Sequence, residues 1–407
     1  MIRQLTHRLG HECTPRVIWK FARLFCWPSM LAVERLAARR RRGEIFPAFL
    51  FISLTTRCQL ACRGCWTPHP GAPRDLPLVV FHRLVDEAKS CGIRFFGILG
   101  GEPLLYTPRD DTASGKGRPL WRALAQHPDC YFQVFTNGFS LNDEDAASMA
   151  ALGNVTPLVS IEGLAITSDE RRRGHGVYAA ALQALGHCRR HGLLLGAASS
   201  ICRSNFDELV AFSFLEELVR QGVHYMWYYI YRPAGPNPCR HLALDRGQIK
   251  ALRAFLLDAR ERLPLLVVDS YWDHLGRALC PAAAGIAFHV NADGAIEPCP
   301  PIQLACDSVA TQQPFADCLG RSRFLRDFGQ IAASRTRGCI LLEAPTMLQE
   351  AALANGARDT SGRDFFAELR AMSPLPSHDM AGEEMPERHW FYRLAKKRWF
   401  FGFGAYG

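Results

Sequence analysis

The 407-residue sequence has no long apolar run and no internal repeat beyond an alternation of strand-like and helix-like patterns. No stretch reaches the roughly 18 uninterrupted apolar residues that a membrane-spanning helix needs. Charged residues interrupt the apolar runs before Ile45, so no cleavable secretory signal is expected. Acidic residues are scarce in residues 1–43, which hold ten Arg and Lys against two Glu and carry +8 of the net +9. These absences predict a cytoplasmic protein and argue against nucleic-acid binding by the chain as a whole.

Cysteine, in contrast, is abundant, with an odd total of 15. In a reducing cytosol, clustered cysteines bind metal more often than they form disulfides. Most of the cysteines outside one cluster stand singly and are typical of small buried apolar side chains. Examples are Cys91, Cys130, Cys188 and Cys202.

Short apolar segments alternate with amphipathic helical patterns from Phe46 onward. The predicted strands are 46–54, 93–100, 131–137, 156–162, 193–201 and 224–231. The predicted helices are 77–91, 118–127, 142–152, 177–191 and 205–221, the last with Asn205 as N-cap and Glu208 at the capping-box position. The pattern predicts an α/β fold, a partial (β/α)6 barrel of the TIM type, with its active site at the C-terminal strand ends. An open doubly wound sheet is compatible with the same pattern.

Three cysteines follow the first predicted strand within one loop. Cys58, Cys62 and Cys65 lie within eight residues and can converge on one soft metal centre. As ligands of a four-iron cluster, they would leave one iron open for a substrate or cofactor. His69 follows Cys65 by four residues, so a closed zinc site with three Cys and one His is the alternative.

A glycine pair ends the second predicted strand, in the run Gly100-Gly101-Glu102-Pro103. A barrel places its binding loops at this end of its strands. Two glycines let a ligand approach the backbone closely, and a carboxylate there could receive an ammonium group. The cysteine triplet after the first strand and this run after the second together favour a cofactor site.

With these two motifs the chain resembles the radical S-adenosylmethionine (radical SAM) superfamily, whose hallmark is CxxxCxxC after the first strand of a partial (β/α)6 barrel. The resemblance implies that S-adenosylmethionine chelates the open iron through its amino and carboxylate groups. It also implies that Gly100, Gly101 and Glu102 contact the methionyl amine. The family usually has an aromatic residue before the third cysteine, where this chain has Gly64, with Trp66 just beyond. A backbone contact from this loop to adenine is compatible with that departure, whereas a stacking role for position 64 is not.

Three further segments resemble family elements. VSIEG (159–163) is similar to S-[IL]-D-G with Glu162 in place of Asp, which implies that Ser160 lies near the ribose or carboxylate of the cofactor. DERRRGHGVY (169–178) is similar to D-x-x-R before a glycine-rich turn. Arg172 matches the family's arginine that pairs with the cofactor carboxylate, and Arg173 is the second candidate for that role. Alternatively, Arg171, Arg172 and Arg173 form a solvated surface run. Asn137 in the FTNG turn matches a common family element, although a simple Asn-Gly turn would also explain it.

A second cysteine region begins at Cys280, and its C-x13-G-x4-C pattern resembles the start of a SPASM or twitch auxiliary-cluster domain. A hairpin turn at Asp293-Gly294 would bring Cys280 and Cys299 toward each other. The usual continuation, CxxCx5CxxxC, is absent. The expectation is one auxiliary four-iron cluster held by Cys280, Cys299 and Cys339, with Cys306 and Cys318 either as a fourth ligand or as buried thiols.

The chain divides into four predicted parts. In order, they are a basic amphipathic helical segment (1–44), the radical SAM partial barrel (45–235), a small α+β SPASM/twitch-like domain (236–345), and a strap with a basic aromatic tail (346–407). Both ends combine aromatic and cationic residues, which suits either peripheral contact with an anionic membrane surface or packing against the barrel. An acidic leader peptide is a third candidate partner. Asp269, Tyr271 and Asp273 could supply a general base or simply form an ordered loop.

The resemblance implies a radical SAM enzyme that cleaves S-adenosylmethionine reductively at a 4Fe–4S cluster. The resulting 5′-deoxyadenosyl radical would abstract hydrogen from a peptide or a small molecule. The implied partners are that substrate and an electron donor such as flavodoxin or ferredoxin, and a second 4Fe–4S cluster is expected. The alternative is a zinc-binding structural or interaction protein without radical chemistry.

Overall fold

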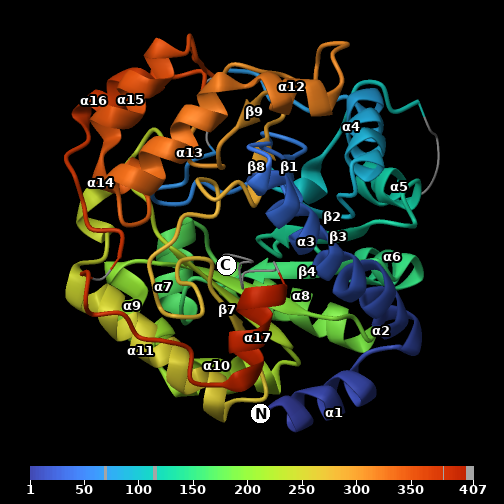
Figure 1. The fold of residues 1–407 in the computed structure, drawn as a ribbon. Coiled ribbons are helices and arrows are strands. Elements are labelled where there is room, and N and C mark those ends of the chain that lie inside the picture. The colour runs from blue at the N-terminus through green and yellow to red at the C-terminus, as the bar shows by residue number, and fades with distance from the viewer. Residues whose placement is uncertain (68–70, 113–116, 379, 400–407) are drawn as a thin grey trace.

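The computed structural model describes residues 1–67, 71–112, 117–378 and 380–399. A nine-stranded sheet forms its centre, in the order β7-β6-β5-β4-β3-β2-β1-β8-β9 (Figure 1). Every neighbouring pair is parallel except β8 and β9. The strands are β1 (Phe49–Ser53), β2 (Phe95–Leu99), β3 (Tyr131–Thr136), β4 (Val155–Ser160), β5 (Gly196–Ile201), β6 (Tyr225–Ile230), β7 (Leu266–Val268), β8 (Ala287–Val290) and β9 (Ile296–Glu297).

Strands β1 to β7 are neighbours in the order in which the chain forms them. Because parallel crossovers are almost always right-handed, a sheet built in one direction keeps its crossover helices on one face. A doubly wound sheet reverses its strand order at a switch point, and β1 to β7 show no reversal. The partial barrel is confirmed, and the doubly wound alternative is wrong. The crossover helices are α4 (Leu78–Ser90), α5 (Pro119–Ala125), α6 (Asp143–Leu152), α7 (Ala165–Arg172), α8 (Val177–Arg190), α9 (Phe206–Leu209), α10 (Phe212–Arg220) and α11 (Arg246–Arg262).

The expected helix 205–221 is interrupted between α9 and α10, and its predicted capping box is wrong. The Asn205 amide donates 2.9 Å to the Glu162 carbonyl and accepts 2.7 Å from the Cys202 N–H. Glu208 accepts 2.6 Å from the Leu164 N–H. Both side chains therefore join the loop after β4 to the loop after β5, which fixes the backbone around Glu162.

The sheet continues beyond the six predicted strands at both edges. β7 pairs with β6, and β8 pairs in parallel with β1. A turn at 291–295 then returns the chain as β9, with Gly294 at φ +80°, so the predicted Asp-Gly hairpin is confirmed. The predicted domain boundary at 235 stays a prediction, but strands from both sides of it share this sheet.

The N-terminal helices close the end of the barrel where the strands begin. They are α1 (Ile2–Glu12), α2 (Pro15–Phe21), a π-helical turn (Ala22–Cys26) and α3 (Trp27–Arg41). The Phe25 ring lies 5.1 Å from Phe95 and 5.7 Å from Tyr131, the first residues of β2 and β3. Arg8 donates to the carbonyls of Val223 and Pro264, ahead of β6 and β7. These helices therefore lie at the end of the barrel opposite the C-terminal strand ends.

The C-terminal helix α17 (Trp390–Arg398) packs beside α3 (Figure 1). The following Trp399 places its ring 5.8 Å from Phe25 and donates its indole N–H to the Ser29 hydroxyl. The predicted packing against the barrel is thus confirmed, because each end of the chain contacts the barrel with one of its faces. The side chains of Trp19, Trp27 and Trp390 are exposed. None of the described helices is long and apolar enough to cross a membrane.

Five short helices and a two-stranded ribbon build the remaining layer, which stands beside the C-terminal strand ends (Figure 1). They are α12 (Phe315–Arg321), α13 (Arg323–Arg335), α14 (Ile340–Glu343), α15 (Pro345–Ala354), α16 (Phe365–Ala371), β10 (Leu304–Ala305) and β11 (Arg358–Asp359). Helix α12 packs against α4 and its buried residues belong to the barrel core. The rest of this layer has a second apolar core, and Cys280, Cys299 and Cys339 lie at or beside it.

A buried ion cluster attaches the C-terminal strap to the barrel. The Glu387 carboxylate lies 2.8 Å from Arg253 and 2.6 Å from Arg260, both on α11. Lys396 from α17 lies 3.3 Å from Asp269, which also pairs with Arg260. All five side chains are at most 1% exposed, so these charges have no solvent to stabilise them and depend on one another.

Replacing Glu387 by Gln leaves three buried cations facing the single carboxylate of Asp269. We expect Glu387→Gln to lower the free energy of unfolding by about 3 kcal/mol, measured by urea denaturation, because it leaves buried charge uncompensated. Glu383→Gln is the matched control, since its 2.9 Å pair with Lys250 is exposed on both sides. Equal stability of the two variants would contradict this account.

Candidate active site

The cysteine triplet opens onto a cavity of about 370 Å³ at the C-terminal end of the barrel. Cys58, Cys62 and Cys65 all line it, in the loop that follows β1. Burial together with Cys62 raises the pKa of the Cys65 thiol. Because the thiolate is the metal ligand, metal binding at this loop must release the thiol protons.

The loops after β1 and β2 are joined backbone to backbone. The Gly101 N–H donates 2.7 Å to the Thr55 carbonyl, and the Glu102 N–H donates 2.6 Å to the Arg57 carbonyl. A side chain at Gly100 would place its Cβ 2.7 Å from the Thr55 oxygen, and one at Gly101 would overlap the Arg57 carbonyl. The glycine pair thus permits this close approach, and both glycines line the cavity as predicted.

The Glu102 carboxylate does not line that cavity. It is fully buried and accepts 2.8 Å from the Thr136 hydroxyl, 2.8 Å from the Asn137 N–H and 3.2 Å from the Leu104 N–H. These three donors partly offset the burial that raises the pKa of Glu102. The carboxylate expected to meet an ammonium group instead holds the turn after β3 against the loop after β2.

Asn137 also lines the cavity. Its amide nitrogen lies 3.9 Å from the Cys58 sulfur, and its amide oxygen accepts 3.2 Å from Gln59. Ser160, at the end of β4, also lines the cavity. The loops after β1, β3 and β4 thus meet at one site.

Arg171 and Arg172 each have a defined place, so the interpretation as a solvated surface run is wrong for these two, whereas Arg173 is exposed. Arg171 is buried and exchanges hydrogen bonds with the backbone of Arg63 in the cysteine loop. Arg172 lines the cavity, donates 2.7 Å to Glu162 and lies 3.9 Å from the Cys62 sulfur. Arg173 lines the same cavity with a left-handed φ of +51°.

Glu162, expected among the cofactor contacts, is absent from the cavity lining. It accepts from Arg172 and, at 3.0 Å, from the Ser200 N–H. Trp66 is also outside the lining and stands edge-on to His289 at 5.7 Å. Glu162 orients Arg172, therefore, while Trp66 contributes to the wall between the cysteine loop and β8. His69 of the zinc alternative lies outside the described residues.

The segment 231–237, which follows β6, is part of the site. Gly64 has a φ of +67°, and a Cβ there would overlap the Tyr231 hydroxyl. Gly235 has a φ of +99°, and a Cβ there would overlap the Cys65 carbonyl. The Tyr231 ring, directly after β6, thus occupies the space that a side chain at position 64 would fill. The rule that barrel sites gather at C-terminal strand ends could have identified these residues.

The second group of cysteines, Cys280, Cys299 and Cys339, lies at or beside the second apolar core. Burial together with Cys339 raises the pKa of Cys280 to about 11. The Arg232 Nε donates to the Cys339 sulfur at 3.4 Å. Cys306 and Cys318 point elsewhere: the Cys306 thiol donates to the Asn355 carbonyl, and Cys318 lies 3.9 Å from the Ser308 and Gln313 carbonyls. Their environment is that of buried thiols.

The suggested general bases are already committed to other partners. Asp269 belongs to the buried ion cluster, and its three cationic neighbours hold its pKa well below the usual range despite burial. Asp273 pairs with Arg277 at 2.6 Å and accepts two backbone N–H groups of its own loop. The Tyr271 hydroxyl accepts from the Ile230 N–H and from Arg232. Asp269 and Asp273 are thus structural, and Tyr271 borders the second cysteine site.

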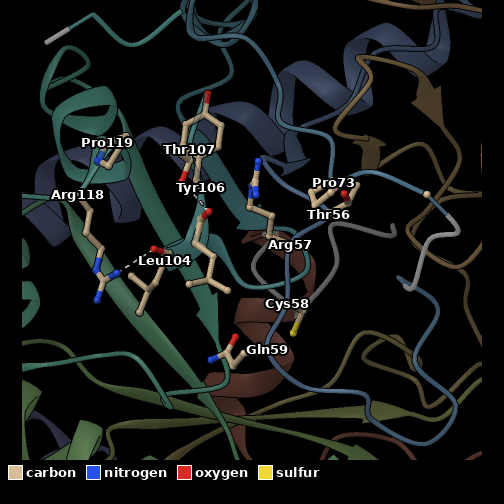
Figure 2. A pocket seen from close by; sticks show the side chains of 12 residues that line it. Thr56, Arg57, Cys58, Gln59, Pro73, Leu104, Tyr106, Thr107, Arg118 and Pro119 are labelled. Carbon is tan, nitrogen blue, oxygen red and sulfur yellow. Dashed lines mark hydrogen bonds between the residues drawn. The ribbon is translucent and has the colours of Figure 1, made fainter. Parts of the chain in front are cut away.

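A second cavity, of about 740 Å³, lies on the outer side of the cysteine loop. Figure 2 shows Arg118 on the opposite side of it from Pro73, with Cys58 at its inner end. Arg118 is anchored by Asp145 at 2.7 Å and by the Leu104 carbonyl. Cys58 borders both cavities, so one thiol of the triplet can be approached from outside the barrel.

A partial parallel barrel with a cysteine loop beside a glycine-lined cavity defines a cofactor-binding barrel protein. Residues 52–199 match the family described as the radical SAM superfamily, so this part of the chain is a radical SAM domain. Members of the superfamily use a 4Fe–4S cluster and S-adenosylmethionine. The predicted family is confirmed, and the zinc alternative is not favoured.

Among curated proteins, the chain is similar to the pre-heme d1 synthase of Dinoroseobacter shibae, with 29% identity over 42% of this chain and 40% of the relative. It is also similar to the mycofactocin maturase MftC of Mycolicibacterium smegmatis, with 30% identity over 46% of each chain. Both matches span less than half of the relative's length. Among solved structures, Streptococcus suis SuiB bound to the precursor peptide SuiA has a TM-score of 0.57 at 15% identity, covering 72% of this chain and 68% of that one.

The contact between Gly64 and Tyr231 predicts a specific sensitivity of the first cysteine site. We expect Gly64→Ala to lower the iron bound by Cys58, Cys62 and Cys65 after anaerobic reconstitution by at least half, because the new Cβ overlaps the Tyr231 hydroxyl and displaces the loop. Gly43→Ala is the matched control, since Gly43 has a similar φ of +72° but no atom within 4 Å of the added Cβ. Normal iron content in Gly64→Ala would refute the predicted displacement.

Proposed function

We propose that the chain is a radical SAM enzyme that modifies a peptide and holds two four-iron clusters. The observation that carries this proposal is the meeting of three thiols, the Gly100-Gly101 backbone and Arg172 around one cavity at the C-terminal end of the barrel. Thiols supply soft ligands for iron, and a backbone exposed by glycine suits a small zwitterionic cofactor.

Each residue of the cavity has a distinct proposed role. Cys58, Cys62 and Cys65 hold the cluster, and the Gly100-Gly101 backbone faces the methionyl amine. Glu162 orients Arg172, and the guanidinium N–H groups of Arg172 that do not donate to Glu162 face the cofactor carboxylate. When bound, the cluster and S-adenosylmethionine supply a 5′-deoxyadenosyl radical for hydrogen abstraction. The chain's work is to orient that cofactor and keep the cavity closed to competing reactants.

Cys280, Cys299 and Cys339 are proposed to hold the auxiliary cluster. Their environment suits one, because the Arg232 guanidinium lies 3.4 Å from the Cys339 sulfur and all three cysteines lie at or beside the second apolar core. A peptide substrate is favoured by the maturase among the curated relatives, and by the peptide bound to the SuiB neighbour. The position of Cys58 between two cavities gives an external electron donor, such as flavodoxin or ferredoxin, a route to the first cluster.

Anaerobic reconstitution with iron and sulfide tests this proposal. We expect a brown protein with about four irons per site, and release of 5′-deoxyadenosine from S-adenosylmethionine under reduction. Cys58→Ala should remove the first cluster and abolish 5′-deoxyadenosine release. Cys91 belongs to neither group of cluster-binding cysteines, so Cys91→Ala should leave the first cluster and 5′-deoxyadenosine release intact. Colourless protein with stoichiometric zinc would instead establish the zinc alternative.

We further propose that the two ends of the chain contact an anionic membrane surface. Trp19, Trp27 and Trp390 are 55%, 64% and 59% exposed on helices that lie at the same end of the barrel. The Arg23 guanidinium lies 5.0 Å from the centre of the Trp19 ring, so cationic and aromatic groups share this surface. Such a combination suits the interface between anionic headgroups and acyl chains.

Vesicle flotation tests this contact. We expect Trp19→Ser with Trp27→Ser to weaken binding to phosphatidylglycerol-containing vesicles at least tenfold, because burial of each large apolar side chain contributes about 2 kcal/mol. Val79→Ser with Ile166→Ser is the control, since these side chains are also highly exposed but lie on barrel helices. Equal binding by both double variants would exclude this surface as the contact.

A further inference from the structure

Arg232, two residues beyond the end of β6, reaches from the barrel to the second cysteine site. Its Nε lies 3.4 Å from the Cys339 sulfur. Its Nη1 donates to the Ile230 carbonyl and lies 3.2 Å from the Tyr271 hydroxyl, while the guanidinium carbon stands 4.8 Å from the centre of the Tyr271 ring. The side chain is thus held on three sides by a carbonyl, a phenol and a thiol.

No salt bridge pairs Arg232 with a carboxylate in the part of the chain that the structure describes. A guanidinium stays protonated in proteins, and a partly buried cation without a counter-charge is costly. The carbonyl and the phenol are neutral partners. The cysteine site is the contact of Arg232 that can supply negative charge, because thiolates bound to iron would be negatively charged.

The neighbouring titratable groups do not compete for this cation. His378 contacts the Tyr271 carbonyl at 2.9 Å, and burial together with Arg232 holds its pKa at about 3, so it is neutral. Glu343 instead accepts from the Ser377 hydroxyl and, at 2.7 Å, from the Arg337 N–H. The charge of Arg232 is therefore directed at the Cys339 sulfur.

We propose that Arg232 is a positioning residue of the auxiliary cluster, which holds the Cys339 ligand and makes the cluster easier to reduce. This inference rests on the auxiliary cluster of the proposed function. Reduction adds one electron from an external reductant to the cluster, and a hydrogen bond and positive charge at a ligand sulfur stabilise that added charge. Because Arg232 lies between Tyr231 and Gly235, which abut the first cysteine loop, the same short segment contacts both sites.

The test uses the full-length chain with Cys58→Ala, Cys62→Ala and Cys65→Ala, so that any bound cluster belongs to the second site. Iron and sulfide are added anaerobically, and the cluster is titrated with dithionite under electron paramagnetic resonance. We expect Arg232→Gln to lower the ratio of reduced to oxidised cluster at a fixed potential about tenfold, equivalent to about 59 mV for one electron. Arg232→Lys, which keeps the charge, should show a smaller shift.

Arg240→Gln is the matched control, because Arg240 belongs to the same loop but donates to the Ala371 and Ser373 carbonyls. Loss of iron from Arg232→Gln but not from Arg232→Lys or Arg240→Gln would also support the holding role. Full iron content with an unchanged potential in Arg232→Gln would overturn the inference. Absence of iron from the parent with Arg232 intact would overturn the auxiliary cluster itself, which is a distinguishable result.

Discussion

The first site depends on the backbone contact between the loops after β1 and β2. Two N–H groups, of Gly101 and Glu102, are donated to the cysteine loop, and only glycine allows the two backbones to approach so closely. The buried Glu102 carboxylate then extends the same connection to the turn after β3 through Thr136 and Asn137. Three loops from three strands are thereby fixed around one cavity before any cofactor binds. A preorganised arrangement of this kind lowers the entropic cost of holding a reactive group in place.

The two cysteine sites are connected by the chain segment that leaves β6. Tyr231 fills the space beside Gly64, Gly235 abuts Cys65, and Arg232 faces Cys339. A displacement of this segment would therefore reach both sites. At the opposite end of the barrel, the N-terminal helices pack against the starts of the strands. The buried ion cluster around Glu387 fixes the strap beside Asp269, the residue that follows β7.

Much of the fold could be predicted, because alternating apolar and amphipathic segments reflect local periodicity. All six predicted strands formed close to their expected bounds, and the Asp-Gly hairpin formed at Gly294. The predicted capping box at Asn205 and Glu208 failed, since both side chains found partners in the loop after β4. Likewise, Asp269 looked like a free carboxylate in the sequence, but α11 and α17 bring three cations to it. These misses have one cause: each side chain satisfied its hydrogen bonds or charge with a residue distant in the sequence.

The sequence by itself determined the chemistry of the first site, because Cys58, Cys62 and Cys65 share one loop and the glycine pair ends the next strand. Local spacing suffices there, since neighbouring residues cannot move far apart. The tertiary structure alone decided which charges are buried and what they face. It separated Arg171, Arg172 and Arg173 into three environments, directed Glu102 inward and placed Arg232 against Cys339. Burial and electrostatic pairing arise from contacts between distant segments, and no local pattern encodes them.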